Sequence, residues 1–188
     1  MRVAGAVLAG GASRRMGRPK ALEPVDGVPM ARRAAAALIA AGIAPVVLVG
    51  GEPPWANALD LPLVADRWPG VGPVGGIATA LLEAPAGVDA VVVVACDQPW
   101  LQPHDLVRLA AALADDPTLD VVVGRTVDRF RQPFPSAWRL AIGPVLASSV
   151  EAGQCRLLTV LDGLSVGEVV VDPGSMIDVD EPGDLPSS

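Results

Sequence analysis

The stretch Val3-Ala-Gly-Ala-Val-Leu-Ala-Gly-Gly-Ala-Ser-Arg-Arg-Met-Gly-Arg-Pro-Lys20 leads from an apolar strand through a glycine turn into a basic cluster. The two glycines have no side chains, so the backbone N–H groups of the turn can point at one anion. The cationic side chains that follow can contact the same anion. Lys20 is the only lysine of the chain. The pattern indicates a loop that holds phosphates, although it matches neither the P-loop spacing nor the dinucleotide fingerprint. The alternative is a lysine kept by chance on a solvated loop.

Apolar runs rich in valine alternate along the chain with alanine- and leucine-rich segments of helical length. The runs predict strands, several buried on both faces, over Val3–Leu8, Pro45–Val49, Leu61–Ala65, Ala90–Ala95, Asp120–Val123 and Glu168–Val171. The other segments predict helices over Pro29–Ala41, Ile77–Ala84, Pro103–Ala114, Ala141–Ala152 and Arg156–Leu161. In a chain of 188 residues, this alternation predicts one α/β domain over residues 1–188, built on a doubly wound, mostly parallel sheet.

Composition and charge exclude several classes of function. The net charge of −7 disfavours nucleic acid, because the arginines beyond position 33 are scattered singly and form no basic stripe. The chain has only two cysteines, Cys96 and Cys155, which are too few to stabilise a domain of this size by disulfide bonds. This number predicts free thiols in a reducing compartment. No segment is as long as a membrane span, and the basic cluster follows the first apolar run, unlike in a signal peptide. We expect a cytoplasmic protein that binds neither nucleic acid nor membrane.

Distinctive residues follow the predicted strands at their carboxyl ends, where such sheets bind ligands. They are Gly10 and Gly11 after the first strand, Gly50 and Gly51 after the second, Asp66 after the third, and Cys96-Asp97 after the fourth. The ionised Asp97 must be solvated, paired or bound to a metal, and opposite a phosphate loop we favour a metal ligand over a helix cap. Asp66 is either a ligand-binding carboxylate or a surface residue in a turn or an ion pair with Arg67. We expect Cys96 to be a small core residue.

The run Gly70-Val-Gly-Pro-Val-Gly75 satisfies the dinucleotide pattern and opens a helix. It would support an NAD-dependent oxidoreductase. However, it follows Asp-Arg-Trp-Pro instead of a strand, and Pro73 lacks an N–H that a pyrophosphate would need. We therefore rank this interpretation low.

The segment Leu8-Ala-Gly-Gly-Ala-Ser-Arg-Arg-Met-Gly-Arg-Pro-Lys20-Ala resembles the signature of nucleotidyltransferases, most closely the molybdenum cofactor guanylyltransferases. That family has Leu-Ala-Gly-Gly, a small or polar pair, Arg-Met-Gly and then a lysine. Further segments resemble the family in order and spacing along nearly the whole chain: Asp66, Gly72-Pro-Val-Gly-Gly-Ile77, Cys96-Asp-Gln-Pro-Trp-Leu101, Gln132-Pro133 and Asp178-Val-Asp-Glu-Pro-Gly-Asp-Leu185.

The resemblance implies a Rossmann-like nucleotidyltransferase fold and Mg²⁺-dependent transfer of GMP from GTP to the phosphate of a molybdopterin cofactor, releasing pyrophosphate. It implies catalytic roles for Arg15, Lys20 and Asp97, with Asp97 as the Mg²⁺ ligand. It implies nucleotide binding by Leu8, Ala9, Gly10, Gly11, Lys20, Gly50, Asp66, Gly72, Gly75, Gly76 and Asp97, and acceptor binding by Gln132, Asp178 and Asp180. GTP and a molybdopterin-type cofactor are then the substrates, and transient contacts with molybdoenzyme assembly proteins are expected.

Departures from the family pattern leave the substrates open. Gly10 stands where cytidylyl relatives commonly carry a second alanine, and the missing methyl leaves room for a purine, which favours GTP. Pro19 favours the other choice, because Pro-Lys is common in cytidylyl and sugar-nucleotide relatives. Asp178 and Asp180 replace two expected asparagines and could bind a second metal or repel an anionic acceptor. A cytidylyl or sugar-nucleotide transferase is therefore the alternative. A non-catalytic assembly partner is disfavoured by the retained Lys20 and Asp97.

Overall fold

The structure is a computed structural model and describes residues 1–10, 19–127 and 131–179. Its centre is a seven-stranded sheet with the order β5-β4-β1-β6-β8-β7-β9. The strands are β1 (Val3–Leu8), β4 (Val46–Val49), β5 (Leu63–Val64), β6 (Ala90–Ala95), β7 (Val121–Arg125), β8 (Arg131–Arg139) and β9 (Val166–Val170). All neighbouring pairs are parallel except the two that β8 makes, with β6 and with β7. The predicted doubly wound, mostly parallel sheet is confirmed.

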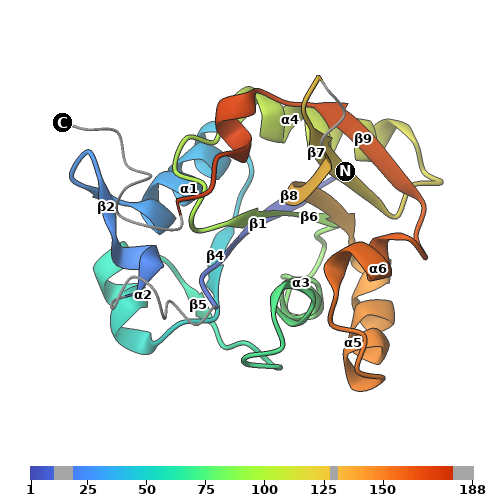
Figure 1. Cartoon of the computed structure of the whole chain (residues 1–188), viewed down its shortest axis with the longest axis horizontal. Helices are drawn as coiled ribbons and strands as arrows, with labels where there is room; N and C mark the ends of the chain where they lie inside the picture. Colours follow the sequence, from blue (N-terminus) through green and yellow to red (C-terminus); the bar gives the residue numbers. More distant parts are fainter. Residues whose placement is uncertain (11–18, 128–130, 180–188) are drawn as a thin grey trace.

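Helices cover both faces of the sheet, so the molecule has three layers (Figure 1). Helices α1 (Met30–Ala40) and α4 (Pro103–Asp115) pack on one face, through a core that includes Leu38, Leu106 and Leu109. Helices α3 (Pro73–Leu82), α5 (Gly143–Glu151) and α6 (Leu157–Leu161) pack on the other face. The valines of β6 alternate between these two cores, which explains why this strand is apolar at every position.

Smaller elements complete the fold. They are the 3₁₀ turn η1 (Lys20–Leu22), the hairpin strands β2 (Pro24–Val25) and β3 (Val28–Pro29), the helix α2 (Pro53–Leu59), and the 3₁₀ turns η2 (Leu140–Ile142) and η3 (Pro173–Met176). Asp26 and Gly27 form the hairpin turn, both with positive φ. The hairpin and η3 lie on the side of the sheet covered by α1 and α4 (Figure 1).

Most predicted elements are confirmed to within a few residues, and β1 and β6 match at both ends. The strand β8, the helix α2 and the hairpin β2–β3 were not predicted. The start of α3 was predicted at Ile77 and lies at Pro73. Within the described part of the chain, no helix has the length and apolarity to cross a bilayer.

Candidate active site

Lys20 and Asp97 meet beyond the carboxyl ends of β1 and β6. The Lys20 Nζ atom lies 3.3 Å from Asp97 Oδ2, although the two residues are 77 positions apart in the chain. Their side chains are 18% and 24% exposed, so both charges border solvent and remain accessible to a ligand. The two strands are parallel neighbours and pair Leu8 with Ala95, which brings the segments that follow them to one edge. The predicted juxtaposition of this ammonium and carboxylate is confirmed.

The turn that carries Asp97 is held from several sides. Cys96 N–H donates to Leu8 C=O at 3.1 Å, and Val179 N–H donates to Asp97 C=O at 2.9 Å. The buried Gln98 side chain donates from Nε2 to Phe134 C=O at 3.3 Å. Because its backbone is fixed by β1, β8 and the segment after η3, the carboxylate of Asp97 has a defined position before any ligand binds.

Cys96 has no chemical role in this site. Burial, with a smaller contribution from the Asp97 carboxylate, raises the pKa of its thiol from 9.0 to about 12, and Lys20 offsets only part of this. The thiol is therefore protonated at neutral pH and inert. The expectation of a small core residue is confirmed, since Cys96 is 8% exposed and packs with Val94 and Leu101 in the core beneath α1 and α4.

Glycines at the ends of β1 and β4 allow a close approach of two backbones. Gly50 has φ +77°, and a Cβ there would lie 2.9 Å from both N and Cα of Gly10. No other residue fits that position without moving the turn. Among the residues that the structure describes, a Cβ on Gly10 would instead meet only Asp66 Oδ2 at 3.5 Å and Gly50 Cα at 3.8 Å, which are ordinary contacts. The described residues thus leave room for a ligand beside Gly10.

Asp66 faces this space with one carboxylate oxygen. Its Oδ1 accepts hydrogen bonds from Trp68 N–H at 3.0 Å and from the Thr79 hydroxyl at 3.1 Å. Arg67 pairs with Glu83, not with Asp66. Two surface roles were predicted for Asp66 as the alternative to ligand binding. The role in a turn is confirmed, through Oδ1, and the ion pair with Arg67 was wrong. The Oδ2 atom lies toward Gly10.

Two adjoining hollows border these residues and share Ala9, Gly10 and Gly72. The first, of about 760 Å³, is lined by the Lys20–Asp97 pair together with Leu8, Pro73, Ala95, Cys96 and Phe134. The second, of about 1200 Å³, is lined by backbone-rich turns together with Gly50, Glu52, Trp55 and Asp66. The first hollow is charged and the second combines an aromatic ring with carboxylates.

The amino end of α3 opens at the border between the two hollows. Gly72 precedes this helix with φ +95°, and Pro73 is its first residue. Unpaired N–H groups and the helix dipole favour an anion at such an end. Gly75 and Gly76 line neither hollow. Both are buried in α3, where a Cβ would lie 3.1 Å from Trp68 Cβ and 3.3 Å from Leu8 Cδ1, so in this structure they serve close packing.

The remaining predicted residues lie around the first hollow or outside the described residues. Gln132 is in β8, two positions before Phe134, which lines the first hollow. Asp178 is exposed and directly precedes Val179, which bonds to the Asp97 turn. Gly11, Arg15 and Asp180 lie outside the described residues.

The Asp97 side chain fits a divalent cation that is shared with a ligand. Among the residues that the structure describes, no cluster of three or more histidine, cysteine, aspartate or glutamate side chains could hold a metal alone. Mg²⁺ in phosphate-binding sites typically takes one or two carboxylates and completes its shell with phosphate oxygens and water. One carboxylate at the mouth of a charged hollow matches that donor set.

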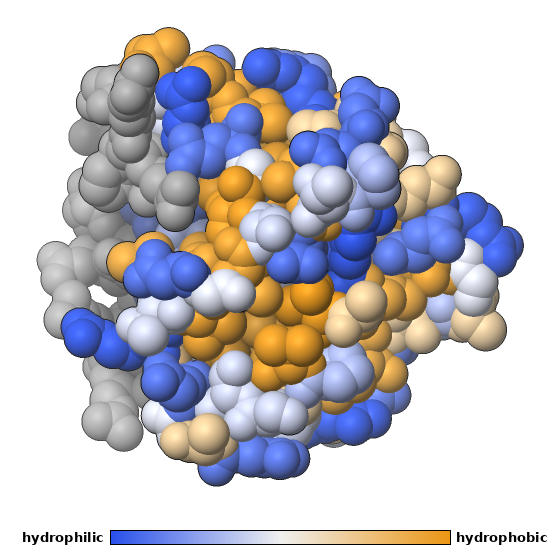
Figure 2. Space-filling view, turned by 90° about the vertical axis from the view of Figure 1, so that its right-hand side faces the viewer, coloured by the Kyte–Doolittle hydropathy of each residue, from blue (hydrophilic) through white to orange (hydrophobic). Residues whose placement is uncertain are grey.

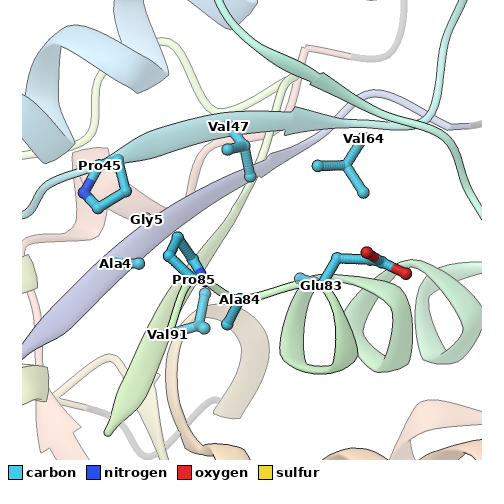
Figure 3. Close-up of a pocket in the computed structure, with 10 residues that line it drawn as sticks. Ala4, Gly5, Pro45, Val47, Val64, Glu83, Ala84, Pro85 and Val91 are labelled. Carbon is cyan, nitrogen blue, oxygen red and sulfur yellow. The ribbon is translucent and has the colours of Figure 1, made fainter. Parts of the chain in front are cut away.

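Another hollow, on the face of the sheet covered by α3, has a different character (Figure 3). It lies between β1, β4 and the carboxyl end of α3, and its lining is apolar apart from Glu83. Glu83 lies at its rim and is engaged by Arg67. Without a polar group directed inward, this crevice is a packing feature and binds no charged substrate.

Sequence reasoning missed several residues of the site. Trp55 and Glu52 line the second hollow because α2 places them there, and Thr79 fixes Asp66 from α3. Phe134 lines the first hollow from β8. The start of α2 could have been predicted from Pro53-Pro54, since prolines favour the first turn of a helix. Nothing in the local sequence marked Thr79 or Phe134.

Comparison with known proteins defines the class. The model of the MobA-like NTP transferase domain family matches residues 5–166. The molybdenum cofactor guanylyltransferase of Rhodobacter capsulatus is 35% identical over 188 residues, which covers 98% of this chain and 94% of that protein. The chain therefore belongs to the MobA-like NTP transferase family, and it is a nucleotidyltransferase by family.

Solved structures share the fold. The molybdopterin-guanine dinucleotide biosynthesis protein A of Archaeoglobus fulgidus superposes with a TM-score of 0.78 at 23% identity, over 98% of this chain and 95% of that one. A CMP:2-keto-3-deoxy-manno-octonic acid synthetase complexed with CTP superposes with a TM-score of 0.73 at 16% identity, over 97% and 95%. The names of these two proteins refer to different nucleotides, so the shared fold does not by itself identify the nucleotide.

Proposed function

We propose that this protein transfers GMP from GTP to the terminal phosphate of a molybdopterin-type cofactor, acting as one domain in the cytoplasm. The observation that carries the proposal is the contact of Lys20 with Asp97 at the shared edge of β1 and β6. Family membership and the 35% identity with a molybdenum cofactor guanylyltransferase support the choice of reaction.

The two hollows fit the two parts of a nucleotide. The charged hollow with Lys20 and Asp97 suits the triphosphate, and the amino end of α3 adds N–H donors at its border. The hollow beside Gly10 suits the nucleoside, because Asp66 Oδ2 can accept from the ring N–H and amino groups of guanine, and Trp55 offers an aromatic surface. Guanine presents two such donors on one edge, which a carboxylate can accept together.

In the reaction, a phosphate oxygen of the acceptor attacks the α-phosphorus of GTP, the bond to the bridging oxygen breaks, and pyrophosphate leaves. Lys20 would neutralise charge that builds on the phosphate oxygens, as Arg15 would from the loop before it. Asp97 would hold Mg²⁺, which supplies charge neutralisation at the phosphates when bound. Gln132, Asp178 and Asp180 would contact the acceptor. No covalent intermediate with the protein is needed.

The first experiment measures pyrophosphate release from GTP and molybdopterin cofactor with Mg²⁺. We expect Lys20→Ala and Asp97→Asn each to lower kcat by about 10²-fold or more, on the order of 3 kcal/mol of barrier, because each removes a charge that acts in the transition state. Asp89→Asn is the matched control, since Asp89 lies at the other end of β6, where its carboxylate accepts from Arg2 N–H. Wild-type rates in folded Lys20 and Asp97 variants would refute the assignment.

A cytidylyltransferase is the second candidate. The sequence before Lys20 favours it through Pro19, and the fold is shared with an enzyme solved with CTP. A thermal-shift series with each nucleoside triphosphate and Mg²⁺ separates the two: GTP should raise the melting temperature most. A larger shift with CTP would assign the protein to cytidylyl transfer.

A further inference from the structure

The spacing of Lys20 and Asp97 requires a support other than their own ion pair. The two residues belong to separate short segments, η1 and the turn after β6, and neither lies inside a long helix or strand. Their single contact, 3.3 Å between partly exposed groups, is of a kind that contributes at most about 1 kcal/mol. Phosphate binding would also compete for both charges. Other contacts must therefore keep the two segments at a fixed separation.

Arg33 contacts both segments from the first turns of α1. Its Nε donates to Pro99 C=O at 3.1 Å, two residues after Asp97. Its Nη1 donates to Val25 C=O at 3.2 Å and to Asp26 Oδ2 at 3.1 Å, in the hairpin that follows η1. The Arg33 side chain is 26% exposed, so these bonds are partly sheltered from water.

The hairpin is in turn bonded to the Lys20 segment. Glu23 N–H donates to Lys20 C=O at 3.0 Å, and Met30 N–H donates to Glu23 C=O at 2.9 Å. Beneath these bonds lies a small apolar cluster of Val25, Met30 and Val179, with Trp100 packed against it. Arg33 thus bonds the hairpin after Lys20 to the turn after Asp97, and α1 carries it on the face of the sheet.

We propose that Arg33 is a positioning residue, which sets the separation of Lys20 and Asp97 through its bonds to Val25, Asp26 and Pro99; its effect on turnover rests on the proposed function. A guanidinium is suited to this task, because its planar fork holds acceptors on two segments at fixed angles. A lysine has one terminal nitrogen on a flexible stem and cannot hold the same acceptors in the same geometry.

The test compares Arg33→Lys with Arg32→Lys. Arg32 is the next residue of the same helix, and it also donates to a backbone carbonyl, that of Leu59 at 2.8 Å, away from the pair. We expect Arg33→Lys to lower kcat by about tenfold or more with KM for GTP changed less than about threefold, because misplaced groups lose rate before they lose binding. Arg32→Lys should keep kcat within about twofold at a similar melting temperature. Equal kcat in the two variants would overturn the proposal.

Hydrogen exchange of the free protein gives a readout that needs no catalysis. Arg33→Lys should speed exchange at the amides of Glu23, Met30 and Val179, which bond within the linked segments, and Arg32→Lys should leave them unchanged. Unchanged exchange in Arg33→Lys would overturn the positioning role, whereas a wild-type protein inactive with GTP would refute only the proposed function. If Arg33→Lys does not fold, Asp26→Gly replaces it. Asp26 is exposed and has φ +51°, so glycine fits there, and we expect a smaller change in the same direction.

Discussion

At the scale of single residues, Gly10 is the position where one methyl group should change the choice of nucleotide. Its backbone does not need a glycine, and an alanine Cβ would meet, among the described residues, only Asp66 Oδ2 at 3.5 Å and Gly50 Cα at 3.8 Å. Gly10→Ala should therefore fold normally and place its methyl in the hollow that we assign to the base. We expect the affinity for GTP to fall by about tenfold relative to CTP, a loss of about 1.4 kcal/mol, measured by titration calorimetry with Mg²⁺.

Gly163→Ala is the matched control for this change, because Gly163 is exposed, has no positive φ and lies after α6, far from the hollows. An unchanged ratio of GTP to CTP affinity in Gly10→Ala would place the base elsewhere. The identity of such residues could be predicted from the sequence, as Gly10, Lys20 and Asp97 were. The sequence did not reveal Arg33 or Thr79, because the bond from Arg33 to Pro99 spans 66 residues and the bond from Thr79 to Asp66 spans 13.

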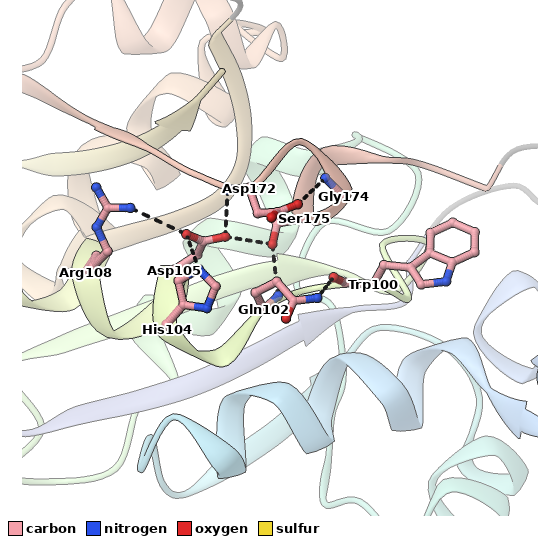
Figure 4. Close-up of polar contacts among 8 residues, drawn as sticks. All are labelled: Trp100, Gln102, His104, Asp105, Arg108, Asp172, Gly174 and Ser175. Atoms are coloured by element: carbon pink, nitrogen blue, oxygen red, sulfur yellow. Dashed lines mark hydrogen bonds and ion pairs between the residues drawn. The ribbon is translucent and has the colours of Figure 1, made fainter. Parts of the chain in front are cut away.

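At the scale of elements, a buried carboxylate fastens the segment after β9 to the start of α4 (Figure 4). Asp105 is fully buried, and its Oδ2 accepts from Asp172 N–H at 2.9 Å and from the Ser175 hydroxyl at 2.8 Å. We expect Asp105→Ala to lower the free energy of unfolding by about 3 kcal/mol, because the buried Ser175 hydroxyl and the partly buried Asp172 N–H both lose their acceptor. Asp115→Ala, at the exposed carboxyl end of α4, should change it by less than about 0.5 kcal/mol. Urea unfolding curves of both variants test this, and equal midpoints would contradict it.

Prediction of elements from sequence succeeded where burial of apolar side chains determined the pattern. The strands β1 and β6 are buried on both faces, so an uninterrupted apolar run marked them. The strand β8 escaped notice because Pro133 and Pro135 stand within it and interrupt the pattern. The hairpin was missed although Asp26-Gly27 is a strong turn signal, since strands of two residues have no periodicity to detect.

At the scale of the whole molecule, β9 forms one edge of the sheet, and no other strand of the described residues pairs with its outer side. Figure 2 looks onto this side and shows apolar residues gathered in its middle among polar ones. Glu168 is the only charged residue of β9 and is exposed, at the centre of the strand, where it pairs with Arg125 at 3.3 Å. A charge on an edge strand opposes pairing with a second copy. We expect Glu168→Val to raise self-association in light scattering, relative to the parent protein at the same concentration.

Glu151→Val is the control for this prediction, because it adds the same side chain at an exposed position at the end of α5. Equal association of the two variants would mean that general hydrophobicity, not the strand edge, is responsible. The sequence could not predict which strand forms the edge, because every valine-rich run has a similar composition. The order β5-β4-β1-β6-β8-β7-β9 follows from how the elements pack on one another.

Local patterns were enough to predict the α/β class, the main strands and helices, and the residue types available for phosphate chemistry, because burial and turn formation leave such patterns in the chain. The packed fold was needed to show that Lys20 lies 3.3 Å from Asp97, that Asp66 presents one oxygen to the space beside Gly10, and that Arg33 joins two segments of the site. These contacts connect distant positions, and packing between whole elements creates them, so no local pattern records them.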